Sequence, residues 1–322
     1  MKKNFDKKIG GYLDFEFAYS NSMPYPQAYP VSCGRAGLEL IIRHRQYKRV
    51  FVPAYICQTV KDVLNKIGVT TVFYYLTKSL EPEFIPEIKS GDCFIYVNYF
   101  GVRDAICNNL VKEIPGIVLD LTQAFFYEPS LHIDAFNSAR KFIGVPDGGF
   151  LFSDFSHLLN LPSNVAYDSC KHLLMRADGE TEKGYAVFRE NEKKINQWEP
   201  MQMSRISKAI LQSVDIHLIK KVRNRNFNFL HKHLLNYNDF FIEKNTSGAL
   251  SYPLLTENGT RIKNTLCSEG IFVPTYWPGI EDSVAEGSIE KRLLDNLVCL
   301  PIDQRYNEED MLRVIKRVLS MI

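Results

Sequence analysis

Short apolar runs that alternate with helix-like segments set the strongest constraint on the fold of this chain. Four such runs, rich in β-branched and aromatic residues, lie at 49–53, 70–76, 92–97 and 116–119. Strand signals that alternate with helix signals are typical of parallel sheets joined by crossover connections. The run at 116–119 is apolar throughout, as expected for a strand that is buried on both faces. The sequence therefore predicts an α/β chain built on a mostly parallel sheet.

Three residues with constrained or polar side chains stand where these strands end. Pro53 ends the first run, Asn98 follows the third, and Asp120 follows the fourth. Ligands of open α/β sheets bind outside the carboxyl ends of the strands. We therefore expect these three residues to converge on one edge of the sheet.

The stretch 134–150 carries a lysine in a polar turn. Ser138 lies three residues before Lys141, and the glycines that follow are Gly144, Gly148 and Gly149. Glycines let the backbone approach a ligand closely. A strand-end carboxylate followed by a lysine on a glycine-rich turn is what a pyridoxal phosphate enzyme needs. The amine forms a Schiff base, and the carboxylate keeps the pyridine nitrogen protonated. Lys141 and Asp120 are thus the predicted catalytic residues.

Each of these residues also has a simpler explanation. A strand-end aspartate often caps the next turn, and a single lysine is more often a solvated surface residue. Gln123 either hydrogen-bonds the phenolic oxygen of the cofactor or satisfies the backbone. The order of Asp120 and Lys141, with the glycines after them, favours the functional interpretation of that pair.

A second candidate site begins after residue 30. Ser32 is a plausible N-cap for a helix that starts with Cys33, Gly34 and Arg35. Free N–H groups at a helix start bind phosphate, helped by the helix dipole. A plain capped helix explains this stretch about equally well.

The run from Asp120 to Gln123, then Lys141 and the Gly148-Gly149 pair, resembles the DegT/DnrJ/EryC1/StrS family of sugar aminotransferases. The resemblance implies a type I pyridoxal phosphate-dependent transferase fold. That fold has an αβα large domain with a mostly parallel sheet and a small C-terminal α/β domain. It also implies a homodimer that transfers an amino group from an amino acid donor to a nucleotide-linked keto-sugar. The pathway implied is cell-surface polysaccharide or sugar biosynthesis.

The same resemblance assigns the residues that hold the cofactor. The family's phosphate-binding Ser-Gly-Thr run corresponds to the residues around Gly34, where Arg35 adds a cation. A family serine five residues before the lysine is replaced by Phe136, which leaves Ser138 as the available hydroxyl. The aromatic residue that stacks on the pyridine ring corresponds to Cys57, with Tyr55 as the nearest aromatic. The predicted cofactor-binding set is Lys141, Asp120, Gln123, Gly34, Arg35, Ser138 and Cys57.

Two alternatives stay open at this point. The sequence departs from the family pattern at Cys57, Phe136 and Pro200, which suggests a member with lost or altered chemistry. The other alternative is a nucleotide-binding α/β protein without pyridoxal chemistry. That protein would carry a glycine-rich loop after its first strand, and the sequence contains neither Gly-x-Gly-x-x-Gly nor a Walker motif.

The rest of the chain predicts a second, smaller domain. We expect a large domain over 1–235 and a small domain over 236–322. Helical spacing from Ser204 to Tyr237 predicts one connecting helix of roughly 50 Å. The charged run 176–183 is interpreted as a solvated loop, and 240–242 as a short strand.

Composition limits the kinds of binding partner and the cellular compartment that we expect for this chain. A formal net charge of +2 over 322 residues gives no reason to expect nucleic acid or an anionic membrane as partner. None of the seven cysteines forms a Cys-x-x-Cys pair, which is typical of reduced thiols in a cytoplasmic protein. The dispersed histidines predict no metal site, and no apolar run is long enough to span a bilayer.

Overall fold

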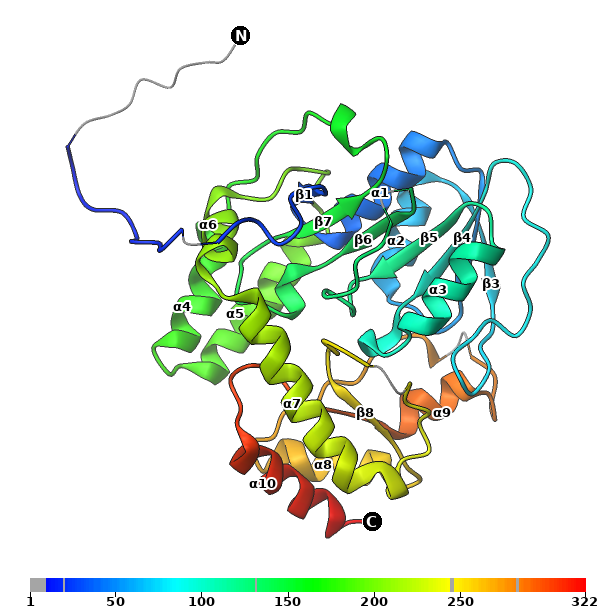
Figure 1. Ribbon diagram of the computed structural model, residues 1–322, viewed down its shortest axis with the longest axis vertical. Helices are drawn as coiled ribbons and strands as arrows, with labels where there is room; N and C mark the ends of the chain where they lie inside the picture. The colour runs from blue at the N-terminus through cyan, green and yellow to red at the C-terminus, as the bar shows by residue number, and fades with distance from the viewer. Residues whose placement is uncertain (1–9, 20, 131, 244–245, 282–283) are drawn as a thin grey trace.

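A seven-stranded sheet and a separate two-stranded sheet form the framework of the molecule (Figure 1). The computed structural model describes residues 10–19, 21–130, 132–243, 246–281 and 284–322. Strand order in the large sheet is β1-β7-β6-β5-β4-β2-β3. The strands are β1 (Tyr29–Val31), β2 (Arg49–Pro53), β3 (Thr70–Tyr74), β4 (Asp92–Val97), β5 (Ile117–Leu121), β6 (Asp134–Asn137) and β7 (Gly149–Phe152).

Parallel pairing dominates the large sheet, which confirms the prediction from sequence. Strands β3, β2, β4, β5 and β6 pair in parallel, and β7 is antiparallel to both β6 and β1. Every residue of β4 and β5 is buried, as expected for central strands covered on both faces. Their carboxyl ends deliver Asn98 and Asp120 to the same edge, where Asn98 N–H donates to the Asp120 carbonyl at 3.0 Å.

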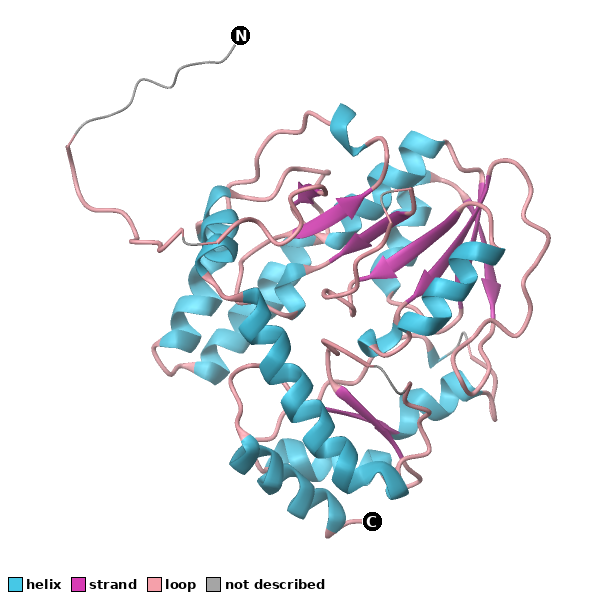
Figure 2. Cartoon of the chain, in the orientation of Figure 1, coloured by secondary structure: helices cyan, strands magenta, loops and turns pink. Residues whose placement is uncertain are grey.

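Three helices join successive strands and cover the sheet (Figures 1 and 2). Helix α3 (Asp104–Glu113) lies on the near face in Figure 1, and α1 (Gly34–Arg45) and α2 (Gln58–Ile67) lie on the opposite face. Helix α1 packs closely on β6: a Cβ at Gly37 would lie 2.8 Å from Phe136 Cβ. Glycine at that position is therefore what allows the helix to sit so near the sheet.

The region after β7 contains more helix than the sequence predicts. Helices α4 (Lys171–Ala177) and α5 (Thr181–Ile195) pack against each other. Only 178–180 lies outside them, so the prediction of a solvated loop over 176–183 is wrong apart from that turn. Arg176 lies at the end of one helix and Glu182 and Lys183 at the start of the next, while Asp178 and Glu180 lie in the turn between them.

The predicted single connecting helix is also wrong, because two helices occupy that stretch. They are α6 (Arg205–Ser213) and α7 (Ile216–Leu234). Each begins with its own side-chain cap: Ser204 Oγ accepts from Ser207 N–H at 3.2 Å, and Asp215 Oδ1 accepts from Leu218 N–H at 2.9 Å. An aspartate in the extended conformation of an N-cap starts a new helix despite the continuous apolar spacing.

The C-terminal part is built on the two-stranded antiparallel sheet. Its elements are β8 (Tyr252–Leu255), α8 (Gly259–Ser268), α9 (Ile289–Asn296), β9 (Leu297–Leu300) and α10 (Glu308–Leu319). Residues 240–242 form no strand, contrary to the prediction. Helix α7 packs against β8 and α10. The boundary after residue 235 stays a prediction.

Over the part of the chain that the structure describes, no helix combines the length and the apolarity required to cross a bilayer. The same residues contain no cluster of three or more His, Cys, Asp or Glu side chains that could hold a metal ion.

The split between α6 and α7 predicts the effect of removing the second cap. Asp215→Ala is expected to cost about 1 kcal/mol, because the N–H of Leu218 loses its acceptor. For a chain of this size that lowers the thermal midpoint by roughly 1.5 °C, measured by circular dichroism. Asp215→Asn keeps an acceptor oxygen and is the matched control. Equal midpoints for the Ala and Asn variants would contradict the capping role.

Candidate active site at the carboxyl edge of the sheet

Asp120 occupies the centre of the sheet's carboxyl edge. It lies in β5, beside Val97 of β4 and Phe136 of β6, and its residue is only 4% exposed. The Thr122 N–H donates to Asp120 Oδ1 at 2.8 Å. Burial raises the pKa of the Asp120 carboxyl, while the Lys141 cation and hydrogen bonds from Thr122 oppose that shift. A buried carboxylate with a raised pKa gains most from a cation placed beside it.

Lys141 reaches the same edge from the turn after β6. It ends the short 3₁₀ helix Ala139–Lys141 and is exposed to solvent. Its Nζ donates to Thr122 Oγ1 at 3.1 Å. Thr122 thus contacts both candidate catalytic residues, through its backbone N–H on one side and its hydroxyl on the other. The structure brings the predicted pair Asp120 and Lys141 together.

Gln123 combines a satisfied oxygen with a free donor. Its Oε1 accepts from the Phe100 N–H at 2.7 Å, which holds Phe100 at a left-handed φ of 57°. That conformation is costly for a bulky residue and persists where the surroundings enforce it. The Nε2 of Gln123 is buried and has no hydrogen-bond partner among the described residues. The Phe100 backbone thus occupies the side-chain oxygen of Gln123. The side-chain nitrogen of Gln123 is left to donate to a ligand at this edge.

The N-terminus of α1 meets this edge through two glycines. A Cβ at Gly34 would lie 2.9 Å from Thr122 Cγ2 and 3.2 Å from the Asn137 carbonyl oxygen. A Cβ at Gly149 would lie 2.3 Å from the same oxygen. The helix start can approach β5 and β6 this closely only because both residues lack a side chain.

The cap of α1 differs from the expected one. Cys33, not Ser32, is the N-cap, and it makes no side-chain cap hydrogen bond. Ser32 Oγ is buried, as is one terminal nitrogen of Arg35 in the first turn, and neither has a partner in the described part of the chain. A hydroxyl and a cation with unused hydrogen bonds therefore lie at or beside a helix start that has no side-chain cap.

Ser138 and Cys57 are both caps of short turns or helices. Ser138 is 7% exposed and precedes the 3₁₀ helix that carries Lys141. Cys57 is the N-cap of α2, and its Sγ accepts from Thr59 Oγ1 at 3.0 Å. Tyr55, the nearest aromatic, is fully buried, with its ring 4.7 Å from that of Trp277. Its burial under the C-terminal part keeps Tyr55 from stacking on a ligand at the edge.

Asp147 is a buried carboxylate that the sequence interpretation missed. It is 0% exposed and accepts hydrogen bonds from Asn164 Nδ2 at 3.0 Å, from Ser204 N–H at 2.9 Å and from the hydroxyls of Ser204 and Ser207. It directly precedes Gly148 and so ties the turn after Lys141 to the start of α6. In the sequence, the position of Asp147 directly before the Gly148-Gly149 pair was a feature that could have identified it.

The C-terminal part holds the residue next to Lys141. Gln304 Nε2 donates to the Phe142 carbonyl at 2.8 Å, and the guanidinium of Arg223 lies 4.7 Å from the centre of the Phe142 ring. Arg223 is 2% exposed and has no carboxylate partner among the described residues. Burial lowers the pKa of its guanidinium to about 10. These contacts fix the lysine turn from both parts of the chain.

Comparison with known proteins places this site in a familiar fold. No protein-family model matches the sequence, and no curated protein matches it by sequence. Solved structures do match across most of the chain. A DegT DnrJ EryC1 StrS aminotransferase from Brucella abortus has 17% identity, covers 91% of this chain and 85% of its own, and gives a TM-score of 0.61.

Two further neighbours carry ligand information. Spr1654 from Streptococcus pneumoniae, solved in its PLP form, has 15% identity, coverage of 92% and 87%, and a TM-score of 0.65. DesI, solved in the presence of its TDP-sugar product, has 14% identity, coverage of 90% and 79%, and a TM-score of 0.62. The chain has the fold of these proteins, and the predicted type I transferase fold is confirmed.

The hydrogen bonds of Asp147 predict a strong structural dependence on this carboxylate. Asp147→Asn replaces one acceptor oxygen by a donor and leaves buried hydroxyls or an N–H without acceptors. We expect a loss of about 2–3 kcal/mol, measured by thermal unfolding. Asp154→Asn is the control: this more exposed carboxylate pairs with Arg45, which also pairs with Asp134, so we expect at most about 1 kcal/mol. Similar losses in both variants would contradict the anchoring role.

Proposed function

We propose that this chain is a pyridoxal phosphate-dependent aminotransferase of the DegT/DnrJ/EryC1/StrS family. The observation that carries the proposal is the meeting of the buried Asp120 with the exposed Lys141 across Thr122. It occurs at the carboxyl edge of a parallel sheet, where ligands of such folds bind. The fold shared with the Brucella abortus aminotransferase supports the same assignment.

The unused polar groups around this edge fit the cofactor. Gln123 Nε2 is a buried donor for the phenolic oxygen. The start of α1, with Gly34 and Arg35, offers N–H groups and a cation for the phosphate, and Ser138 lies at the neighbouring turn. When bound, the cofactor supplies an electron sink that stabilises the carbanion formed at the donor's α-carbon.

Three residues of the chain would then each have a separate role in the reaction. Lys141 Nζ would form the covalent link, and after its release it would move the proton between the donor's α-carbon and C4′ of the cofactor. Thr122 Oγ1 would hold that amine in place. Asp120 would keep the ring nitrogen protonated, because a cation beside the carboxylate offsets the cost of its burial.

The substrates we propose are an amino acid donor and a nucleotide-linked keto-sugar, in cell-surface polysaccharide or sugar biosynthesis. The DesI structure with its TDP-sugar product supports this class. We also propose a cytoplasmic homodimer, with a large domain over 1–235 and a small domain over 236–322.

One observation favours a member with altered chemistry as the second candidate. The residue expected to stack on the pyridine ring is Cys57, and Tyr55 packs beneath Trp277 instead. Without an aromatic ring at that face, the cofactor loses a stacking contact worth about 0.5–1.5 kcal/mol. Transamination of a keto-sugar by the purified protein distinguishes the two candidates.

Covalent trapping tests the role of Lys141. After borohydride reduction of cofactor-loaded protein, mass spectrometry is expected to find the pyridoxyl label on the peptide that contains Lys141. Lys141→Ala is expected to carry no label and to retain non-covalent binding. Lys208→Ala, which removes a partly buried lysine of α6, is the control and keeps the label. A label on a different lysine, or none on fully loaded protein, overturns the family assignment.

Substitution of Asp120 tests the second catalytic residue. Asp120→Asn is expected to slow transamination by about 100-fold or more, since a neutral amide cannot hold the pyridinium proton. Steady-state kinetics on the loaded enzyme measures this, and unchanged turnover removes Asp120 from the site.

The stability of the cofactor-free variant is the control for misfolding. Because burial raises the pKa of Asp120 in the folded state, the ionised carboxylate costs stability as the pH rises from 3.8 through the folded pKa. The neutral Asn variant escapes that cost. We expect it to be at least as stable as the original protein at pH 7, and to lose this advantage as the pH falls to 3.8.

A further inference from the structure

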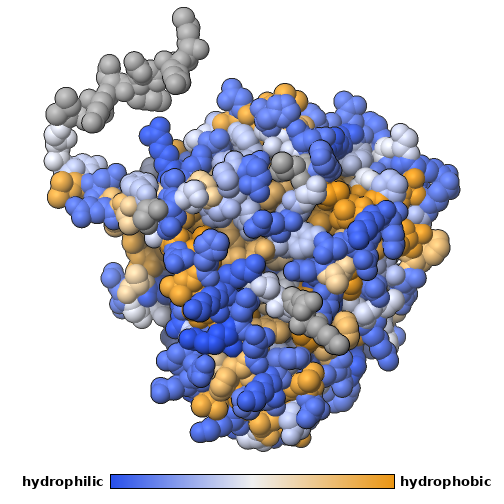
Figure 3. All heavy atoms as spheres, in the orientation of Figure 1, coloured by the Kyte–Doolittle hydropathy of each residue, from blue (hydrophilic) through white to orange (hydrophobic). Residues whose placement is uncertain are grey.

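The segment Gly10–Tyr19, here called the arm, stands apart from the body of the molecule (Figures 1 and 3). It forms no helix or strand. Four of its aromatic or aliphatic residues are largely exposed: Tyr12 at 100%, Leu13 at 89%, Phe15 at 65% and Tyr19 at 61%. Contiguous exposed apolar side chains in a folded protein mark a binding surface.

The sequence of the arm has the pattern of a strand. Leu13, Phe15, Phe17 and Tyr19 alternate with the acidic residues Asp14 and Glu16. Such alternation is typical of a strand with one apolar face and one polar face. Asp14 and Glu16 form no ion pair among the residues that the structure describes. The arm thus presents an apolar face and a face with two carboxylates, and neither carboxylate pairs with a cation among the residues that the structure describes.

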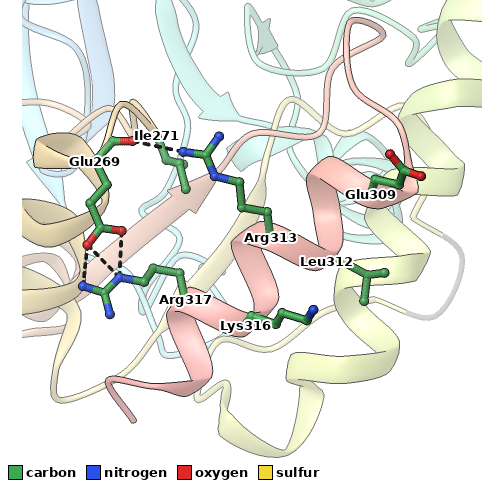
Figure 4. A pocket seen from close by; sticks show the side chains of 7 residues that line it. All are labelled: Glu269, Ile271, Glu309, Leu312, Arg313, Lys316 and Arg317. Atoms are coloured by element: carbon green, nitrogen blue, oxygen red, sulfur yellow. Dashed lines mark hydrogen bonds and ion pairs between the residues drawn. The ribbon is translucent and has the colours of Figure 1, made fainter.

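A groove on the C-terminal part has the complementary pair of walls (Figure 4). This α8–α10 groove has a volume of about 550 Å³ and is lined by α10 and by the residues after α8. Ile271 lines the side that faces α10, and its neighbour Phe272 is 63% exposed. The other wall is α10, which contributes Leu312 and the cations Arg313, Lys316 and Arg317.

Among the residues that the structure describes, two of the three cations in this groove have no carboxylate partner. Arg317 pairs with Glu269, but Arg313 donates only to the Glu269 carbonyl oxygen at 3.2 Å. Lys316 forms no ion pair within the described ranges. Glu309, the remaining acidic lining residue, lies in the first turn of α10, at the far end of the groove from Arg317 in Figure 4.

The spacing of the charges matches between arm and groove. Side chains two apart on one face of a strand are separated by roughly 6.6 Å, which applies to Asp14 and Glu16. Residues three apart on a helix have Cβ atoms about 5–6 Å from each other, which applies to Arg313 and Lys316. A strand inserted between the two walls can face α10 with its carboxylates and Ile271 with its aromatic rings.

We propose that the arm of one copy of this chain docks in the α8–α10 groove of a second copy. The arm leaves the body where Asn21 donates to the carbonyls of Gln212 and Val214, at 3.0 and 3.1 Å, beside the start of α7. Figure 1 places α10 at the opposite end of α7. When each copy inserts its arm into the groove of the other, both arms and both grooves are occupied within one homodimer.

Charge reversal tests the pairing. Asp14→Lys/Glu16→Lys and Arg313→Glu/Lys316→Glu are each expected to weaken self-association at least tenfold, measured by sedimentation equilibrium on the full chain. The combined fourfold variant, which restores opposite charges, is expected to recover most of the affinity. Lys221→Glu/Lys232→Glu on the exposed face of α7 is the control and leaves association unchanged. Equal association constants for all variants overturn the proposal.

Cross-linking identifies which copy the arm occupies. In a Cys267→Ser background, Phe15→Cys with Lys316→Cys is expected to yield a disulfide-linked dimer on non-reducing gels. Neither single cysteine variant should yield this product at comparable rate. A link within one chain, seen as a monomer of altered mobility, overturns exchange between copies, as does the absence of any link under oxidation.

Discussion

The burial of one carboxylate at the end of β5 governs the arrangement of this site. Asp120 lies between two neighbouring strands and is 4% exposed, so its charge depends on nearby donors and cations. Thr122 N–H supplies a hydrogen bond, and Lys141 supplies a positive charge that lowers the carboxyl's pKa against the effect of burial. The turn after β6 must therefore return to this edge, and β7 must run antiparallel to carry the chain away.

Close packing of backbone completes the edge. Gly34 brings the start of α1 against Thr122, and Gly149 brings β7 against the Asn137 carbonyl. A methyl group at Gly34 would push the helix start away from Thr122, and one at Gly149 would push β7 away from the Asn137 carbonyl. Ser32 and Arg35, at the start of α1, each have a buried polar atom without a partner among the described residues, as does Gln123, which directly follows Thr122. The density of unsatisfied buried groups there contrasts with the general rule that such groups are paired.

Local patterns predicted the sheet and the proximity of Asp120 and Lys141, because strands, glycines and an ordered Asp–Lys pair have short-range signatures. Contacts between distant segments could not be read in this way. Tyr55 is buried by Trp277, and Asp147 is satisfied by Ser204 and Ser207, all of which are remote in sequence. The break before α7 had a local cause in Asp215, but continuous apolar spacing concealed it.

The hydrogen bond from Gln304 to the Phe142 carbonyl has a consequence for biosynthesis of the protein. The two residues are 162 positions apart, so the turn that carries Lys141 lacks this support until almost the whole chain has left the ribosome. Asp147 similarly waits for Ser204 and Ser207. The N-terminal strands can pair during translation, which proceeds at about 5–20 residues per second. The lysine turn therefore gains its contact with Gln304 only late in synthesis, and until then the nascent chain presents an incomplete site.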